Sequence, residues 1–204
     1  MQKYDVIVAG GGFAGVAAAV SAARCGRKVL LFERANCLGG AATNCLVNPF
    51  MPYHTVINGK RTALSAGIFK EITDKLNEFQ ILTGGTESMP HINEEHLKII
   101  LNRMVLEAGV SLLFHAVLTE TDYEDGKIKS VTVATKSGNL TFCADYFIDA
   151  TGDADLAAKC NCSFRLGRDE DNLCQPMTLC FRASNVDVSL FYEEKPALIA
   201  LYKQ

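Results

Sequence analysis

The chain has 204 residues, of which 49% are hydrophobic and 21% are charged, and its formal net charge is −3. This composition is typical of a folded globular protein and excludes an intrinsically disordered one. The small negative charge and the lack of a basic run argue against nucleic acid or an anionic membrane as a partner.

The N-terminus leaves no room for a signal peptide, because a strand-like run begins at Tyr4, and no apolar stretch is long enough to cross a bilayer. In a chain of this length the eight cysteines are expected to be mostly buried thiols. Cys160-x-Cys162, with Cys174 and Cys180 beyond it, matches no zinc pattern. We therefore expect a cytoplasmic protein without a metal site.

The first forty residues predict a strand–helix–strand unit. Residues 5–9 and 28–33 are short apolar runs, typical of strands that are buried in a parallel sheet. An alanine-rich helix over 14–25 connects them, and Gly26 follows where a helix usually ends. The crossover should be right-handed.

The following segment is irregular. Its prolines and glycines make residues 39–90 an insertion rather than sheet, with one helix near 63–79. A second helix is expected to begin after Asn93, a good N-cap, and to end at Gly109.

Three strand candidates come next, at 110–119, 128–135 and 140–149. The turn sequences YEDGK and KSGN separate them, so the strands are expected to pair antiparallel. A glycine turn and a short helix follow in TGDADLAAK. Beyond them, PMTLCFRA is a further strand candidate, and 187–204 has a mixed character.

Three glycines between the first strand and the first helix form a dinucleotide-binding fingerprint. Gly10 permits the tight turn, Gly12 lets the backbone approach a pyrophosphate, and Gly15 lets the helix pack on the strand. The N-terminus of the helix offers unpaired N–H groups and the positive end of its dipole to the phosphates.

Glu33 closes the second strand, 23 residues after Gly10. An acid at this place is expected to bind the ribose hydroxyls of adenosine and to disfavour a 2′-phosphate. A solvated acid at the end of a strand is the alternative. With strand, glycines, helix and acid in this order, the sequence predicts a nucleotide site.

Two further motifs resemble those of the flavoproteins with two dinucleotide-binding domains, the glutathione-reductase-like group. One is the acid Glu33 followed by Gly39-Gly40, and the other is the strand end Ala150-Thr151-Gly152-Asp153 after a β-meander. The resemblance implies that this turn lies along the ribityl-diphosphate part of FAD, where Asp153 accepts from a ribityl hydroxyl.

More narrowly, almost the whole chain is similar to bacterial FAD-dependent oxidoreductases that share IDATGDADLAA and a QPMTL-type strand. By this resemblance the backbone at Val117 contacts the adenine. The predicted FAD-binding residues are Gly10, Gly12, Phe13, Ala14, Gly15, Glu33, Arg34, Gly39, Gly40, Ala41, Val117, Ala150, Thr151, Gly152 and Asp153.

At two places the sequence differs from related flavoprotein families, and each difference excludes one kind of redox site. Ala42 and Val47 stand about where the dithiol reductases carry their cysteines, so a redox dithiol is not expected. No histidine follows Gly39-Gly40 closely, so FAD should be held without a covalent bond. The catalytic residues stay unassigned, with His54 and Cys45 as the candidates near the flavin.

These observations predict an α/β protein with a Rossmann-type parallel sheet and an inserted three-stranded antiparallel β-meander, an FAD/NAD(P)-binding fold that is incomplete at the C-terminus. Residues 1–40 and 93–160 form the FAD-binding domain, with the meander at about 110–149. Residues 41–92 form an insertion near the flavin, and 161–204 are the truncated start of a substrate domain.

The predicted function is that of an FAD-dependent oxidoreductase acting on a small molecule. A dehydrogenase that uses NAD with a single Rossmann unit and a non-catalytic nucleotide-binding subunit are the alternatives. A second copy or a partner chain is expected to complete the fold.

Overall fold

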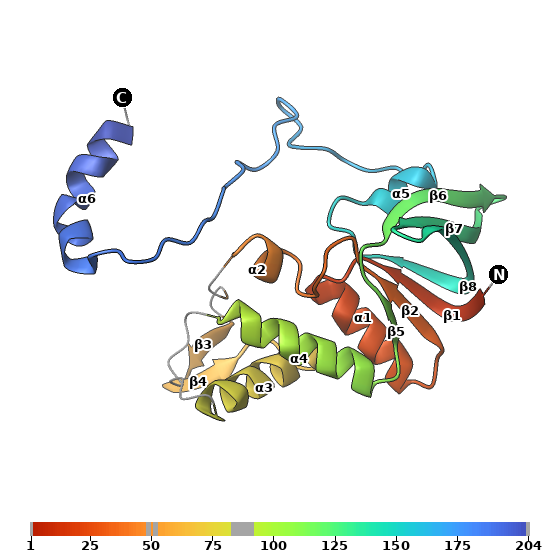
Figure 1. Cartoon of the computed structure of the whole chain (residues 1–204), viewed down its shortest axis with the longest axis horizontal. Coiled ribbons are helices and arrows are strands. Elements are labelled where there is room, and N and C mark those ends of the chain that lie inside the picture. The colour runs from red at the N-terminus through yellow and green to blue at the C-terminus, as the bar shows by residue number, and fades with distance from the viewer. Residues whose placement is uncertain (1, 48–49, 51–52, 83–91, 203–204) are drawn as a thin grey trace.

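A six-stranded sheet lies at the centre of the fold, in the strand order β5-β2-β1-β8-β7-β6 (Figure 1). The computed structural model describes residues 2–47, 50, 53–82 and 92–202. The strands of this sheet are β1 (Gln2–Ala9), β2 (Val29–Phe32), β5 (Ser111–Leu113), β6 (Val117–Glu124), β7 (Lys127–Thr135) and β8 (Gly138–Asp149). The other elements are α1 (Phe13–Arg24), α2 (Ala41–Asn44), the hairpin β3 (His54–Ile57) and β4 (Lys60–Ala63), α3 (Ile68–Leu82), α4 (Glu94–Glu107), α5 (Asp155–Lys159) and α6 (Val188–Tyr202).

β1 is buried on both of its faces, which explains its continuous apolar sequence. Val6 and Val8 pack into the core under α1, α3 and α4, whereas Ile7 and Ala9 pack into a second core under the meander and α5. β1 runs parallel to both of its neighbours, β2 and β8. The predicted strand–helix–strand unit is confirmed.

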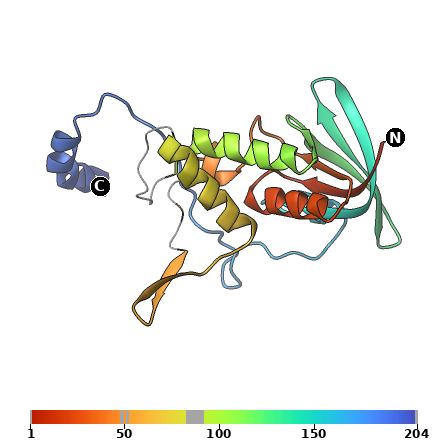
Figure 2. The ribbon, with the colours of Figure 1, turned by 90° about the horizontal axis from the view of Figure 1, so that it is seen from below.

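α1 and α4 cover one face of the sheet, and α3 packs against both of these helices (Figure 2). α1 and α3 are joined by an ion pair in which both guanidinium NH2 groups of Arg24 contact the Glu71 carboxylate, at 2.7 and 2.9 Å. α4 begins as expected, because the Asn93 side chain accepts hydrogen bonds from the N–H groups of Glu95 and His96, both at 3.1 Å.

The meander β6-β7-β8 is antiparallel, as the turn sequences predicted. Asp125 and Gly126 link β6 to β7 with φ angles of 51° and 75°. Positive φ at both central residues is the type I′ geometry that matches the twist of a hairpin.

Three expectations about strands were wrong. The candidate at 110–119 is two strands, because β5 pairs with β2 in the parallel part of the sheet and β6 starts the meander. Residues 39–90 contain the hairpin β3-β4, whose tight Asn58-Gly59 turn was overlooked. PMTLCFRA forms no strand, since no neighbouring strand pairs with it in the described part of the chain.

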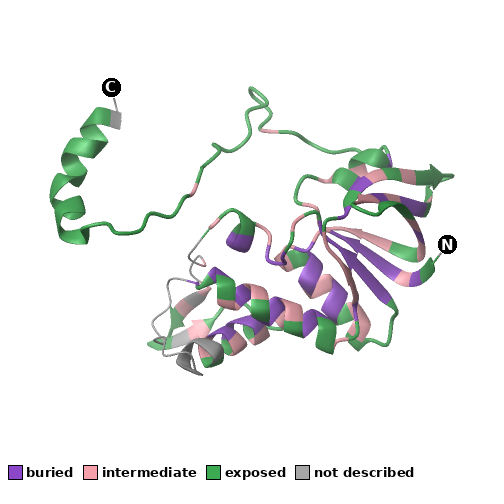
Figure 3. Cartoon of the chain, in the orientation of Figure 1, coloured by how far each residue is buried: buried purple, intermediate pink, exposed green. Residues whose placement is uncertain are grey.

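The segment after α5 is exposed along nearly all of its length (Figure 3). It consists of residues 161–187, called here the arm, and of α6. Within the described ranges, no helix is both long and apolar enough to cross a membrane.

Candidate functional site

The N-terminus of α1 is open. Its N-cap, Gly12, has no side chain to accept from the first-turn N–H groups, and no acidic residue lies in that turn. A Cβ added to Gly12 would have no neighbouring atom within 4 Å. The unpaired N–H groups and the helix dipole therefore face a space that can hold an anionic group.

Gly10 and Gly15 lie against backbone atoms. A Cβ on Gly15 would stand 1.8 Å from the carbonyl oxygen of Gly10. Gly10 has a φ of 98°, and a Cβ there would stand 2.4 Å from the carbonyl oxygen of Ala150. The glycine loop thus touches the end of β8, 140 positions later in the chain.

The Glu33 carboxylate lies buried against the same loop. It accepts hydrogen bonds from the N–H of Gly11 at 2.5 Å and from the N–H of Ala35 at 2.8 Å. Glu33 is 7% exposed. Each carboxylate oxygen can accept more than one hydrogen bond, so capacity for ribose hydroxyls remains.

Gly39-Gly40 meets the glycine loop directly. The N–H of Gly39 donates to the carbonyl oxygen of Gly11 at 2.9 Å, and a Cβ on Gly40 would stand 3.1 Å from the Cα of Gly12. The two glycine motifs therefore form one continuous surface, with α2 following.

Asp149 organises the turn after β8. Its carboxylate accepts from the N–H of Thr151 at 3.0 Å, from the Thr151 hydroxyl at 2.7 Å and from the N–H of Ala157 at 2.9 Å. Ala154, the N-cap of α5, offers no side-chain acceptor, so Asp149 caps this helix from the end of β8. Burial alone would raise the pKa of Asp149, but the hydrogen bonds from Ala157 and Thr151 outweigh it and hold the pKa below its usual value.

A cavity lies between the glycine loop, the end of β2, the start of β6 and the turn after β8. Val117 is half exposed there. The residues that line the cavity are Gly10, Phe32, Glu33, Arg34, Ala116, Val117, Leu118, Thr151 and Asp155. Five of these were predicted, namely Gly10, Glu33, Arg34, Val117 and Thr151.

The other ten predicted residues do not line the cavity. Gly12, Phe13, Ala14 and Gly15 lie at the start of α1, Gly39, Gly40 and Ala41 at the start of α2, and Ala150, Gly152 and Asp153 in the turn between β8 and α5. The catalytic candidates are not brought into the cavity as far as the structure describes them. Cys45 is exposed at the C-cap of α2, and His54 begins β3, with its side chain outside the described atoms.

Sequence reasoning missed Asp149 and Asp155. Asp149 was part of the quoted motif IDATGDADLAA, and its place two residues before a threonine, at the end of a strand, is a signal for a side chain that caps the following turn. Asp155 lines the cavity, and its N–H donates to the Thr151 hydroxyl at 2.9 Å.

A parallel sheet whose first strand leads through a glycine loop into an uncapped helix, with an acid at the end of the second strand, defines a Rossmann-type dinucleotide-binding protein. The sequence profile of the family described as FAD dependent oxidoreductase matches residues 5–201. The chain belongs to this family, and FAD is its cofactor. No curated protein matches the chain.

Solved structures with the same fold include L-proline dehydrogenase from P. horikoshii, with 14% identity, 78% of this chain and 56% of that chain covered, and a TM-score of 0.54. p-Nitrophenol 4-monooxygenase PnpA from Pseudomonas putida DLL-E4 shares 14% identity over 78% of this chain and 43% of its own, with a TM-score of 0.52. THI4 from Thermovibrio ammonificans shares 17% identity over 81% of this chain and 66% of its own, with a TM-score of 0.50. The chain spans less than two thirds of the length of these proteins.

Glu33→Ala is expected to weaken both folding and cofactor binding. The buried N–H of Gly11 loses its acceptor, which costs about 1–3 kcal/mol in the free energy of unfolding. The affinity for FAD should fall roughly ten- to hundredfold if Glu33 accepts from the ribose hydroxyls, as the sequence predicts. Chemical denaturation and titration with FAD measure the two effects. Unchanged FAD affinity would show that Glu33 does not contact the cofactor.

Asp149→Asn is expected to lower the free energy of unfolding by about 1 kcal/mol at neutral pH, the usual effect of losing a helix cap. The asparagine amide has one acceptor oxygen in place of two. Its NH2 group must therefore face the N–H of either Thr151 or Ala157, and two donors cannot form a hydrogen bond with each other. Since the folded-state pKa is lowered, the stabilisation by Asp149 is present above its unfolded-state pKa and is lost as the pH falls through the folded-state pKa. The difference between the two proteins, measured by denaturation against pH, should therefore shrink in acid; a constant difference would contradict this role.

Proposed function

We propose that this chain forms the cofactor-binding part of an oxidoreductase in which non-covalently bound FAD exchanges hydride or electrons with a small-molecule substrate. One observation carries the proposal: Gly12, Glu33 and Gly40 meet at the uncapped start of α1, beside the turn after β8. FAD supplies the redox chemistry when it is bound. The chain supplies donors for the phosphates, acceptors for the ribose and a wall for the adenine.

We assign each part of the site to the part of FAD that its groups can bind. The N–H groups at the start of α1 bind the pyrophosphate, and Glu33 binds the ribose hydroxyls. The half-exposed Val117, which lines the cavity, lies against the adenine. Asp153 and the Gly39-Gly40 surface bind the flavin half. Residues 1–40 and 93–160 thus form the FAD-binding domain, 41–92 an insertion near the flavin, and 161–204 the start of a substrate domain.

The cofactor can be identified directly. Protein purified under mild conditions should show a flavin absorbance spectrum, and heat should release FAD, identified by chromatography. Recovery of FMN or of a nicotinamide nucleotide alone would refute the proposal, because the site would then serve a different cofactor.

The proposal includes a second copy or a partner chain beside β8. β1 pairs with one side of β8 as far as Asp149, whereas β7 pairs with the other side only up to Phe142. Tyr146, in the part that β7 leaves, is 72% exposed. A half-paired strand with an exposed aromatic side chain favours association. Size-exclusion chromatography should show an oligomer or weak FAD retention, and a monomer that keeps one FAD through dialysis would contradict it.

A cytoplasmic location is the last part of the proposal. The eight cysteines all lie in the described part of the chain and form no disulfide, which suits a reducing compartment.

A further inference from the structure

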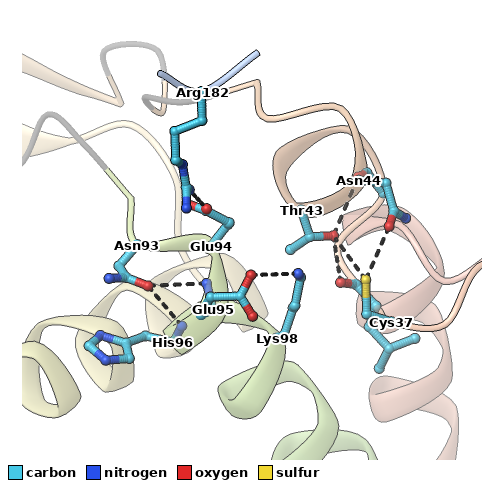
Figure 4. A network of polar contacts seen from close by, with 11 residues as sticks. Cys37, Thr43, Asn44, Asn93, Glu94, Glu95, His96, Lys98 and Arg182 are labelled. Atoms are coloured by element: carbon cyan, nitrogen blue, oxygen red, sulfur yellow. Dashed lines mark hydrogen bonds and ion pairs between the residues drawn. The ribbon is translucent and has the colours of Figure 1, made fainter. Parts of the chain in front are cut away.

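The arm meets the body at the N-terminus of α4. Arg182, near the end of the arm, forms an ion pair with Glu94, the first residue of α4 (Figure 4). The two residues come from segments that are far apart in the sequence, and the body residue belongs to a helix of the layer that covers the sheet. This contact therefore fixes where the arm lies.

Glu94 has a buried carboxylate, which accepts from the Arg182 guanidinium. Its side chain is 7% exposed, whereas that of Arg182 is 65% exposed. A buried carboxylate is costly without a partner, so Glu94 depends on Arg182 more than Arg182 depends on Glu94. Glu95, the next residue, pairs with Lys98 on the same helix and is exposed, so it has no such dependence.

The pair lies beside the proposed flavin half of the cofactor site. α4 packs against α2, which directly follows Gly39-Gly40. Figure 4 shows Thr43 and Asn44 of α2 across from Glu94 and Lys98, which lie in the first two turns of α4. An arm held at Glu94 is therefore held by the helix that packs against α2.

The apolar side chains in this part of the arm are exposed. Met177, Leu179 and Phe181 are 100%, 90% and 81% exposed, whereas Cys180 is partly buried. Arg182, the next residue after Phe181, joins this part of the arm to the body through its ion pair with Glu94.

We propose that Glu94 and Arg182 are positioning residues: their ion pair fastens the arm to the body beside α2 and thereby closes the flavin half of the site. The closing of the site rests on the proposed function, whereas the fastening of the arm does not. Two measurements separate these parts.

The first measurement is limited digestion with chymotrypsin, read out by mass spectrometry. Cleavage after Phe181 requires Arg182, on the other side of the scissile bond, to leave Glu94 and enter the protease cleft, whereas cleavage after Phe164, early in the arm, does not involve this ion pair. Glu94→Gln and Arg182→Gln should each accelerate cleavage after Phe181 by roughly tenfold, since cleavage follows the population of the detached arm. Cleavage after Phe164 should not change.

The double variant tests whether the two residues act through each other. Because either single change already breaks the pair, the double variant should be cleaved after Phe181 no faster than the singles. Glu95→Gln and Arg168→Gln are matched controls, since their ion pairs with Lys98 and Asp171 lie within one segment; both should behave as the unchanged protein. Multiplied effects in the double variant, or equal acceleration at both cleavage sites, would overturn the proposal.

The second measurement is the dissociation rate of FAD from the full chain, followed by the recovery of free flavin fluorescence. Glu94→Gln and Arg182→Gln should raise this rate at least severalfold, and Glu95→Gln should leave it unchanged. Faster cleavage with an unchanged dissociation rate would overturn the closing of the site but keep the fastening. Absence of FAD binding by the unchanged protein would refute the proposed function, while the digestion result would still decide whether the arm is fastened.

Discussion

Gly12→Val is expected to abolish FAD binding while the protein stays folded. A Cβ at this position meets no atom of the protein within 4 Å, so the valine side chain has room in the free protein. It would fill the space in front of the uncapped first turn of α1, where the pyrophosphate is proposed to lie. We expect a loss of affinity of at least about hundredfold, or about 2.8 kcal/mol.

The test compares FAD titration and thermal unfolding without cofactor. Ser21→Val is a matched control, because Ser21 is an exposed residue on the same helix, away from its N-terminus. The control should bind FAD normally, and Gly12→Ala should lie between the unchanged protein and the valine variant. Normal binding by Gly12→Val would show that the phosphates lie elsewhere.

Gly15→Val is expected to act in the opposite way, by destabilising the fold. Its Cβ would stand 1.8 Å from the carbonyl oxygen of Gly10 and 3.3 Å from the Cβ of Ala150. The first contact is with backbone, so α1 would have to move away from β1. Overpacking of this kind costs about 3 kcal/mol or more, which lowers the Tm of a chain of this size by roughly 6–12 °C.

Circular dichroism and thermal unfolding without cofactor measure this effect. Gly12→Val is the matched comparison, since the same substitution three positions earlier has no neighbour to strike. If both variants unfolded at the same temperature, the packing of α1 on the glycine loop would differ from that described here.

The glycine loop and its acid could be predicted because each signal is local. One strand–loop–helix unit explains why glycine is needed at positions 10, 12 and 15. The acid, Glu33, directly follows the next strand. The antiparallel meander was also predictable, because Asp125-Gly126 fixes a hairpin by its own geometry.

The features that were missed depend on which strands become neighbours. Residues 110–119 read as a single strand, but β5 joins β2 at one edge of the sheet and β6 joins β7 at the other, and the chain crosses between the two edges at His115, whose φ is 53°. The role of Asp149 likewise appears only when the turn after β8 folds back over its carboxylate. PMTLCFRA, in the arm, has the sequence of a strand. Whether it forms one depends on a neighbouring strand to pair with, and the sequence of the arm cannot show whether there is one.

The long separation between β1 and β8 has a consequence for the order in which the protein folds. Val6 pairs with Val29 in β2, 23 positions away, but with Tyr146 in β8, 140 positions away. Closing the longer loop costs about 1.6 kcal/mol more in chain entropy, so the β1–β2 unit can form early and the contact with β8 must follow. On the ribosome, the glycine loop is exposed long before Ala150 and Thr151 are synthesised. We expect the chain to acquire affinity for FAD only after the meander has folded, so that cofactor binding reports the last long-range step of folding rather than the first.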